Sequence, residues 1–338
     1  MPLQRIKDRL QILLRLAAVC VVTLFALHVT SLVLYPKNNQ PDMGMVDAKA
    51  TGFLGEPKDS IDVLFLGDSE AYSSFVPLLM WHEQGFTSYV CSTPGQKMPQ
   101  CESILKEALA CQKPKIVVIE TNMLFSGFST DSIIMRAIQE ALPVFEYHDS
   151  WKCLTLDNMF DKPKTTWTDG QKGYLMKYIA GEVDASNYMT PTTSVEEMPA
   201  KNEAYLKQMI AYCKESGATP IFVSTPSTVN WNTARHNTME AWSKEAGIDY
   251  IDYNLASEGV GINWQTDSRD NGDHLNHRGA VKLSKVLGKR LAQDYKLPDH
   301  RDDPQYAEWN RDYARAKNLR PNELRLGDNT NENEGNLA

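Results

Sequence analysis

This sequence of 338 residues lacks an excess of basic residues, metal-binding motifs and internal repeats, and the first two absences argue against nucleic-acid-binding and metal-binding proteins. It lacks an excess of basic residues: the formal net charge is −8, no nucleic-acid-binding module is visible, and nucleic acid is not expected as a partner. It has no HExxH motif and no cysteine pair at metal-ligand spacing, so we expect neither a metal site nor a cofactor. It also has no internal repeat.

Cysteine is present in small numbers and without a recognisable pattern. Cys20 lies in an apolar run, and the remaining five are Cys91, Cys101, Cys111, Cys153 and Cys213. Cys101 and Cys111 are poor partners for each other, because ten residues of helix separate them by about 15 Å. In an oxidising compartment one or two disulfides could form, and otherwise the thiols stay free or buried.

One long apolar run is present, at residues 10–35, and it is long enough to cross a bilayer. Arg5, Lys7, Arg9 and Arg15 all lie before or near its start. Positive charge on that side predicts that residues 1–9 are cytoplasmic and that the rest of the chain faces outward. The run could instead be a cleaved signal peptide, but no clear small-x-small cleavage site follows it. We therefore expect a single-pass anchor that binds the lipid bilayer.

The remaining chain divides by composition into a stalk, a domain and an extension. Residues 36–58 are polar with scattered Pro and Gly, as in a stalk between membrane and domain. The domain is expected at 59–300. An extension follows at 301–338, with a short helix near 306–316 and a polar end that we expect to be disordered.

Five short apolar segments rich in β-branched and aromatic residues read as buried strands. They are 61–66, 86–91, 115–121, 219–225 and 248–253. Helical periodicity fills the gaps at 100–112, 202–217 and 233–247. Alternating strands and helices predict a three-layer α/β/α domain with a five-stranded parallel, flavodoxin-like sheet.

One connection, the insertion 123–200, is far longer than a crossover requires. It contains a helical segment at 131–142 and an aromatic-rich middle with little periodicity. Because it leaves the carboxyl end of the sheet, where such folds bind ligands, it could cover the substrate. It could equally be a peripheral addition.

Ser69 follows the first strand directly in the stretch "IDVLFLGDSEAYSSF". A serine in that turn can cap the next helix, or it can be a nucleophile if a histidine and a carboxylate are supplied elsewhere. A matching stretch lies far downstream, where "DSRDNGDHLNHRGAVKLS" places His274 in an acidic loop before a helix.

Together, "FLGDS" and "HLNHRGAVKLS" resemble the two ends of the GDSL-like, or SGNH, hydrolases over roughly residues 58–297. The resemblance implies that Ser69 is the nucleophile and His274 the base. It also implies that an oxyanion is held by the Ser69 backbone N–H, by Gly95 after the second strand and by Asn122 after the third. The chain has "ETN" where the family has Gly-x-Asn-Asp, so Asn122 could instead simply end its strand.

The acidic partner of His274 departs from the family pattern, because Asn271 stands three residues before it in place of Asp. Asp270 is four residues before His274 and could reach the ring if the turn-prone Asn271-Gly272 is looped out. Asp273 is adjacent and would point away in an extended chain. We expect Asp270 to orient the ring, with Asp267 and Asp273 as alternatives.

Other histidines carry less weight. His82 with Glu83, and Arg235 with His236, could bind substrate but are more typical of surface or core groups. His277 is expected either to face away from His274 or to cap the final helix.

These features predict a membrane-anchored, outward-facing serine esterase or acyltransferase. Its expected substrate is an acylated cell-surface glycan or teichoic acid, with acetyl or D-alanyl as the acyl group, and other cell-envelope proteins are expected as partners. The arrangement is similar to that of the membrane-anchored family that moves D-alanine onto lipoteichoic acid. Two alternatives are a catalytically silent domain that binds polymer or scaffolds membrane proteins, and a lipase or lysophospholipase.

Overall fold

The computed structural model describes residues 2–318. The described chain forms two compact units. Unit 1 comprises the residues up to Ala48 together with Ser129–Trp167, and unit 2 comprises Lys49–Phe128 together with the residues from Thr168 onward. The polar C-terminal end that we expected to be disordered lies outside the described residues.

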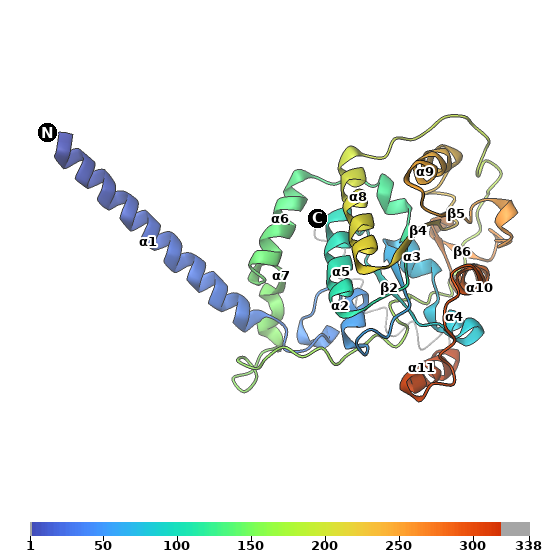
Figure 1. The fold of residues 1–338 in the computed structure, drawn as a ribbon, viewed down its shortest axis with the longest axis horizontal. Coiled ribbons are helices and arrows are strands. Elements are labelled where there is room, and N and C mark those ends of the chain that lie inside the picture. Colours follow the sequence, from blue (N-terminus) through green and yellow to red (C-terminus); the bar gives the residue numbers. More distant parts are fainter. Residues whose placement is uncertain (1, 319–338) are drawn as a thin grey trace. The chain divides into compact units, whose positions relative to one another are not determined.

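Unit 1 is built on the long apolar helix α1 (Pro2–Leu34), drawn in dark blue in Figure 1. Its segment Arg5–Leu34 contains an 18-residue window with a mean hydropathy of 2.4. The segment is therefore long and apolar enough to cross a membrane, a test that a signal sequence also passes. The unit also contains η1 (Pro41–Met43), α6 (Thr130–Ala141), α7 (Val144–Tyr147) and η4 (His148–Cys153). The helix expected at 131–142 is thus present.

Unit 2 contains the five-stranded sheet that the sequence predicts. Its strands are β1 (Val63–Gly67), β2 (Ser88–Ser92), β3 (Ile116–Glu120), β4 (Thr219–Ser224) and β5 (Tyr250–Asp252). They are all parallel and lie in the order β2-β1-β3-β4-β5. The flavodoxin-like prediction is therefore confirmed.

The helices of unit 2 lie around this sheet, and the last of them, α11, ends at the last described residue. They are α2 (Ala48–Thr51, which starts at the last residue of unit 1), η2 (Gly52–Gly55), α3 (Ser69–Ser74), α4 (Pro77–Gln84), α5 (Met98–Cys111), η3 (Asn122–Phe125), α8 (Ala200–Ser216), α9 (Thr233–Ala246), η5 (Ala256–Glu258), η6 (Asp270–Gly272), α10 (His277–Asp294), η7 (Pro304–Tyr306) and α11 (Ala307–Asn318). A small antiparallel pair, β6 (Ser268–Arg269) and β7 (His274–Leu275), was not expected from the sequence.

Alternate strand side chains enter two separate cores, one on each face of the sheet. Leu64 and Leu66 pack with α5, α8 and α9, whereas Val63 and Phe65 pack with α3, α4 and α10. Because both faces are covered, the strands read as continuous apolar runs and not as an alternating pattern. The sheet is thus the middle of three layers.

The boundaries of the domain differ from those expected. The stalk was predicted to end at residue 58, but Phe53 is fully buried in the core of unit 2 and contacts the ring of Tyr89. The insertion 123–200 is split, because Ser129–Trp167 belongs to unit 1 and the rest to unit 2. Leu54 also packs against this core, so two apolar side chains within a mostly polar segment join the end of the expected stalk to the domain.

A buried ion cluster explains why these outlying segments join unit 2. The Lys172 ammonium is 1% exposed and lies 2.8 Å from Glu56 and 2.7 Å from Asp312. Burial opposes the charge on Lys172, but the two carboxylates outweigh it and raise its pKa. The expected stalk, insertion and C-terminal extension thus meet at one charged group, which also lies over the Trp309 ring.

The six cysteines all lie in the described residues and are free. The sequence left open either one or two disulfides or free and buried thiols, and the structure has free thiols.

Candidate active site

Ser69 lies where β1 ends and α3 begins, at the carboxyl end of the sheet. Gly67 is required there, because a Cβ would approach both Ala71 and Glu120 to 2.7 Å. Asp68 is the N-cap of α3 and accepts a hydrogen bond from the Glu70 N–H, while Ser69 is the first helical residue and is half-buried. The capping role considered for Ser69 therefore belongs to Asp68, which leaves the Ser69 hydroxyl free of that task.

His274 lies in β7, and β7 packs against α3, the helix that Ser69 begins. Its Nδ1 is 3.2 Å from Asp270 Oδ2, and its Nε2 is buried without a hydrogen-bond partner among the described residues. A ring held at Nδ1 by a carboxylate with Nε2 unoccupied is what a serine base requires. The bond from Ser69 to Nε2 is not formed in this structure, and such bonds are often long before substrate binds.

The loop before His274 is a tight left-handed turn. Asp270, Asn271 and Gly272 have φ values of 53°, 56° and 85°. At Gly272 a Cβ would lie 2.1 Å from Thr228 Oγ1, so glycine is required at that position. This turn takes up the extra residue and brings Asp270 back to the imidazole.

The three aspartates considered as partners of His274 are placed differently. Asp273 Oδ2 is 3.5 Å from Nδ1, closer than expected, because Asp273 is in a helical and not an extended conformation. Asp267 instead accepts hydrogen bonds from Lys282 Nζ (2.5 Å) and the Asn263 N–H (2.8 Å). Asp270 and Asp273 thus face the ring together, and Asp267 does not.

Asn122 lies just after β3 with its side-chain amide held from both ends. Its Nδ2 donates to Asp68 Oδ2 (2.9 Å), and its Oδ1 accepts from Arg235 Nη1 (3.2 Å). The amide is thereby oriented beside the residue that precedes Ser69. Gly95 lies in the exposed turn after β2, the neighbouring strand, with φ of 59° and open space where a Cβ would be. The printed contacts of the described residues connect Gly95 to none of the other candidates.

Two buried glutamates close to the Gly67-Asp68-Ser69 turn, Glu70 and Glu120, were not identified from the sequence. Glu120 accepts a hydrogen bond from the Asn122 N–H (2.8 Å), and burial together with Asp68 raises its pKa to about 8. Burial, with Glu120 and Asp68 nearby, also raises the pKa of Glu70 well above its usual value. The signal available was a glutamate beside each motif, in "GDSE" and "IETN".

The surroundings of His274 favour the neutral form of its ring, the form that acts as a base. Burial lowers the pKa of His274, and Arg269 adds to the effect, while Asp273 and Asp270 oppose it. Burial likewise raises the pKa of Asp68, against hydrogen bonds from Glu70 and Asn122 and the charge of His274. These groups share one electrostatic environment.

Arg235, considered from the sequence only as a substrate-binding group of low weight, holds several residues of the candidate site together. Besides Asn122, it donates to the Asn230 carbonyl (2.6 Å) and pairs with Glu196 (2.9 Å). Asn230 in turn donates through Nδ2 to both Glu70 and Asp273. One arginine on α9 thereby links the end of β3 to the region around His274.

The other histidines named from the sequence have partners away from the site. His277 bonds the Tyr174 hydroxyl (2.9 Å), and His236 bonds Asp252 (2.7 Å). His82 stacks on the Tyr313 ring at 4.1 Å, and the neighbouring Glu83 lies 3.6 Å from Lys285.

One cluster among the described residues has the spacing of metal ligands. Glu70, Asp273 and His274 each offer one ligand atom, and these atoms lie within 4.8 Å of one another. The Asn230 amide already donates to both carboxylates, and the set uses the same His274 that a serine nucleophile would need. We assign no metal to it.

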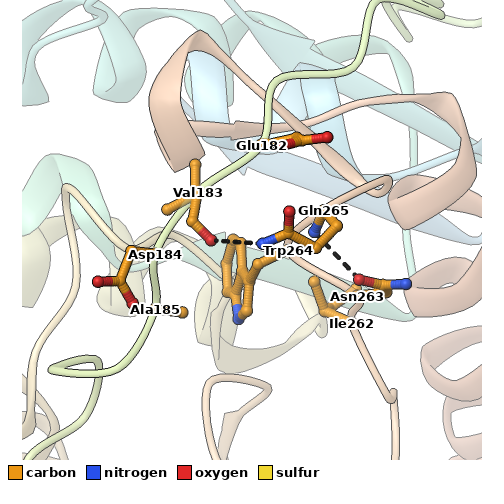
Figure 2. A pocket seen from close by; sticks show the side chains of 8 residues that line it. All are labelled: Glu182, Val183, Asp184, Ala185, Ile262, Asn263, Trp264 and Gln265. Atoms are coloured by element: carbon orange, nitrogen blue, oxygen red, sulfur yellow. Dashed lines mark hydrogen bonds between the residues drawn. The ribbon is translucent and has the colours of Figure 1, made fainter.

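An open groove of about 840 Å³ lies beside the loop that carries His274, and Figure 2 shows its lining side chains. They come from two segments: Glu182, Val183, Asp184 and Ala185 of the insertion, and Ile262, Asn263, Trp264 and Gln265. The Gly181 N–H donates to the Ser268 carbonyl, and a Cβ on Gly272 would lie 3.1 Å from the Val183 methyls. Part of the insertion therefore borders the candidate site.

Comparisons with known proteins give matches in structure only. No protein-family model matches this sequence, and no curated protein matches it. Similar solved structures include the esterase EstA from Pseudoalteromonas sp. (TM-score 0.37, 11% identity, 69% of this chain and 98% of that chain). They also include a GDSL-like lipase from Bacteroides thetaiotaomicron (0.35, 12%, 69% and 88%) and the lipase/acylhydrolase from Enterococcus faecalis (0.31, 12%, 71% and 98%). The function proposed below rests on the geometry of the site and not on these likenesses.

Proposed function

We propose that this protein is an SGNH-type serine hydrolase or acyltransferase, held at a membrane by α1, that acts on acyl esters of cell-surface polymers. The observation that carries the proposal is the state of His274. Its Nδ1 faces the Asp270 carboxylate, its Nε2 has no partner among the described residues, and its strand packs against the helix that Ser69 begins.

In the proposed mechanism, His274 Nε2 takes the proton of the Ser69 hydroxyl as the oxygen attacks an ester carbonyl. Asp270, assisted by Asp273, holds the ring and stabilises the imidazolium that forms. The Ser69 N–H, the Gly95 N–H and Asn122 Nδ2 donate to the oxyanion. His274 then returns the proton to the leaving alcohol, and water or a polymer hydroxyl releases the acyl group.

The groove beside the site supports the substrate class. Its lining carries two carboxylates, Glu182 and Asp184, one indole, Trp264, and no basic side chain. An indole face packs well against the C–H face of a sugar ring, while carboxylates repel phosphate and attract ammonium. We therefore favour a neutral glycan, or an acyl group bearing an ammonium such as D-alanyl, over a phosphate-rich stretch of polymer.

Membrane attachment and outward orientation are part of the same proposal. The apolar segment Arg5–Leu34 and the basic residues near its start support it. If α1 is instead a cleaved signal, the domain is released on the same side of the membrane.

The experiment is to incubate the full chain in detergent with O-acetylated and with D-alanylated cell-surface polymer, and to measure released acetate and D-alanine. We expect release from one of the two, and none from Ser69→Ala or His274→Ala. Ser216→Ala, an exposed serine at the end of α8, is the matched control and should keep full activity. A folded wild-type protein that releases no acyl group and hydrolyses no p-nitrophenyl acetate would contradict the proposal and favour the silent binding domain.

A further inference from the structure

A set of large apolar side chains in unit 1 is left uncovered by the protein. We call it the apolar band; it consists of Ile134, Met135, Ile138, Phe145, Trp151, Leu156 and Phe160. Leu156 is 88% exposed and Phe160 is 81% exposed. Isolated exposed apolar residues are ordinary, but so many within 27 positions mark a surface that binds something.

Helix α6 contributes three exposed apolar side chains to the apolar band, those of Ile134, Met135 and Ile138. Ile134 and Ile138 lie four residues apart and so share one face, yet no residue of α6 is buried. On the same helix, Arg136 lies 3.1 Å from both Glu140 and Glu146, which fixes α6 to α7. The helix is thus held in place with its apolar face open.

Two elements that carry members of the apolar band, α7 with Phe145 and η4 with Trp151, pack against α1. The Val144 N–H donates to Ser31 Oγ (3.1 Å), and the rings of Tyr35 and Tyr147 meet edge to face at 5.1 Å. Figure 1 shows α7 beside the C-terminal end of α1. Farther along, Asn39 exchanges two hydrogen bonds with Trp167, so the chain leaving α1 is fastened to the same segment.

This position is the water boundary of a bilayer that α1 crosses. Aromatic and long apolar side chains are stable there, because their rings and methyl groups enter the acyl chains while polar groups stay hydrated. We propose that residues 130–160 lie in the interfacial layer of the bilayer, with Trp151, Leu156 and Phe160 inserted. The inference rests on the proposed insertion of α1.

The charge of the segment indicates what drives insertion. Ser129–Trp167 contains six acidic residues (Asp131, Glu140, Glu146, Asp149, Asp157, Asp161) and four basic ones (Arg136, Lys152, Lys162, Lys164). A surplus of acid gives no attraction to anionic lipid, so burial of apolar area must supply the free energy. Insertion should therefore occur in phosphatidylcholine alone and should not weaken with added salt.

Tryptophan quenching by brominated lipid tests this directly. No tryptophan lies in α1, so emission quenched by bromine on the acyl chains must come from elsewhere. With the full chain in vesicles of brominated phosphatidylcholine, we expect Trp151→Phe to remove most of the quenchable emission. Trp264→Phe, in the groove of unit 2, is the matched control and should leave the quenched component in place.

A second variant tests the driving force without changing the probe. The double variant Leu156→Asp, Phe160→Asp should abolish quenching of Trp151, whereas Val229→Asp, at an exposed apolar residue of unit 2, should not. Flotation of the vesicles reports on α1 independently. If the protein floats with the vesicles but Trp151→Phe leaves the quenched emission unchanged, the inference is wrong while membrane anchoring stands. The apolar band would then bind a protein partner. A protein that does not float contradicts membrane anchoring as well.

Discussion

The two units differ in where their large apolar side chains lie: most of those in unit 1 are exposed, and most of those in unit 2 are buried. Among the described residues, unit 1 holds 21 of the 25 large hydrophobic side chains that are exposed, and unit 2 holds four: Tyr178, Ile179, Val195 and Val229. All four hydrophobic core clusters are built from unit 2. Unit 2 therefore buries its own apolar side chains, whereas unit 1 leaves most of its large ones exposed, and the proposed bilayer would cover them.

This difference suggests a division of labour between the units. The candidate nucleophile, base and oxyanion donors all belong to unit 2, and the candidate span and the apolar band belong to unit 1. Changes in one unit should then leave the property of the other intact. The predictions below test that separation, beginning with the largest effect.

The largest difference between changes in unit 2 and changes in unit 1 is expected in kcat/KM for a small soluble ester. Ser69→Ala and His274→Ala should each lower kcat/KM for p-nitrophenyl acetate by about 10³-fold or more, because each removes a member of the proposed triad. The double variant Leu156→Asp, Phe160→Asp should leave kcat/KM unchanged. If the change in unit 1 lowers it as much as the loss of Ser69, the units are not separate in function.

The buried ion cluster should set the stability of unit 2. Lys172→Met removes the buried cation that Glu56 and Asp312 share and should cost about 3–5 kcal/mol in the free energy of unfolding. Urea titration of the detergent-solubilised chain measures this, with Lys207→Met, an exposed lysine on α8, as control. Equal stability of the two variants would show that the outlying segments do not hold unit 2 together.

The sequence predicts the features that depend on neighbouring residues, namely strands, helices and short motifs. The five strands, the α5, α6, α8 and α9 helices and the two ends of the candidate site were all read from periodicity and short motifs. The Arg235 contact with Asn122 joins positions 113 residues apart, and no local pattern could reveal it. Lys172 likewise carries no local signal of burial, because its partners Glu56 and Asp312 are distant in the sequence. Asp270 contacts the His274 ring because residues 270–272 form a left-handed turn. The stretch "DNG" predicts a turn but not its handedness.

Arg235 should act as a positioning residue in unit 2. Arg235→Gln removes one of the two hydrogen bonds that orient the Asn122 amide, so kcat should fall about 10- to 100-fold while KM for a small ester changes little. Arg235→Lys, which keeps the charge and one donor, should restore part of the loss. Arg311→Gln, at an arginine of α11 that pairs with Glu308, is the control. A fall in stability that matches the loss of kcat would indicate a merely structural role.

The smallest expected effect concerns Glu70 and pH. Its native pKa is raised above that of the unfolded chain, so the unfolded state ionises first and wild-type stability falls as pH rises above about 4.5. Glu70→Gln removes this penalty. It should be more stable than wild type by on the order of 1 kcal/mol at pH 8, and by less at pH 5. Thermal melts at both pH values measure it, with Glu83→Gln as control; a difference that does not grow with pH contradicts the assignment.

The central claim is that Ser69 is a nucleophile activated by His274, and fluorophosphonate labelling followed by mass spectrometry tests it most directly. We expect one adduct, on Ser69, that is lost in His274→Ala. Its rate should fall only as pH drops through the His274 pKa, which burial holds below 6.5. A folded wild-type chain that takes no label, or takes it on another serine, would contradict the claim.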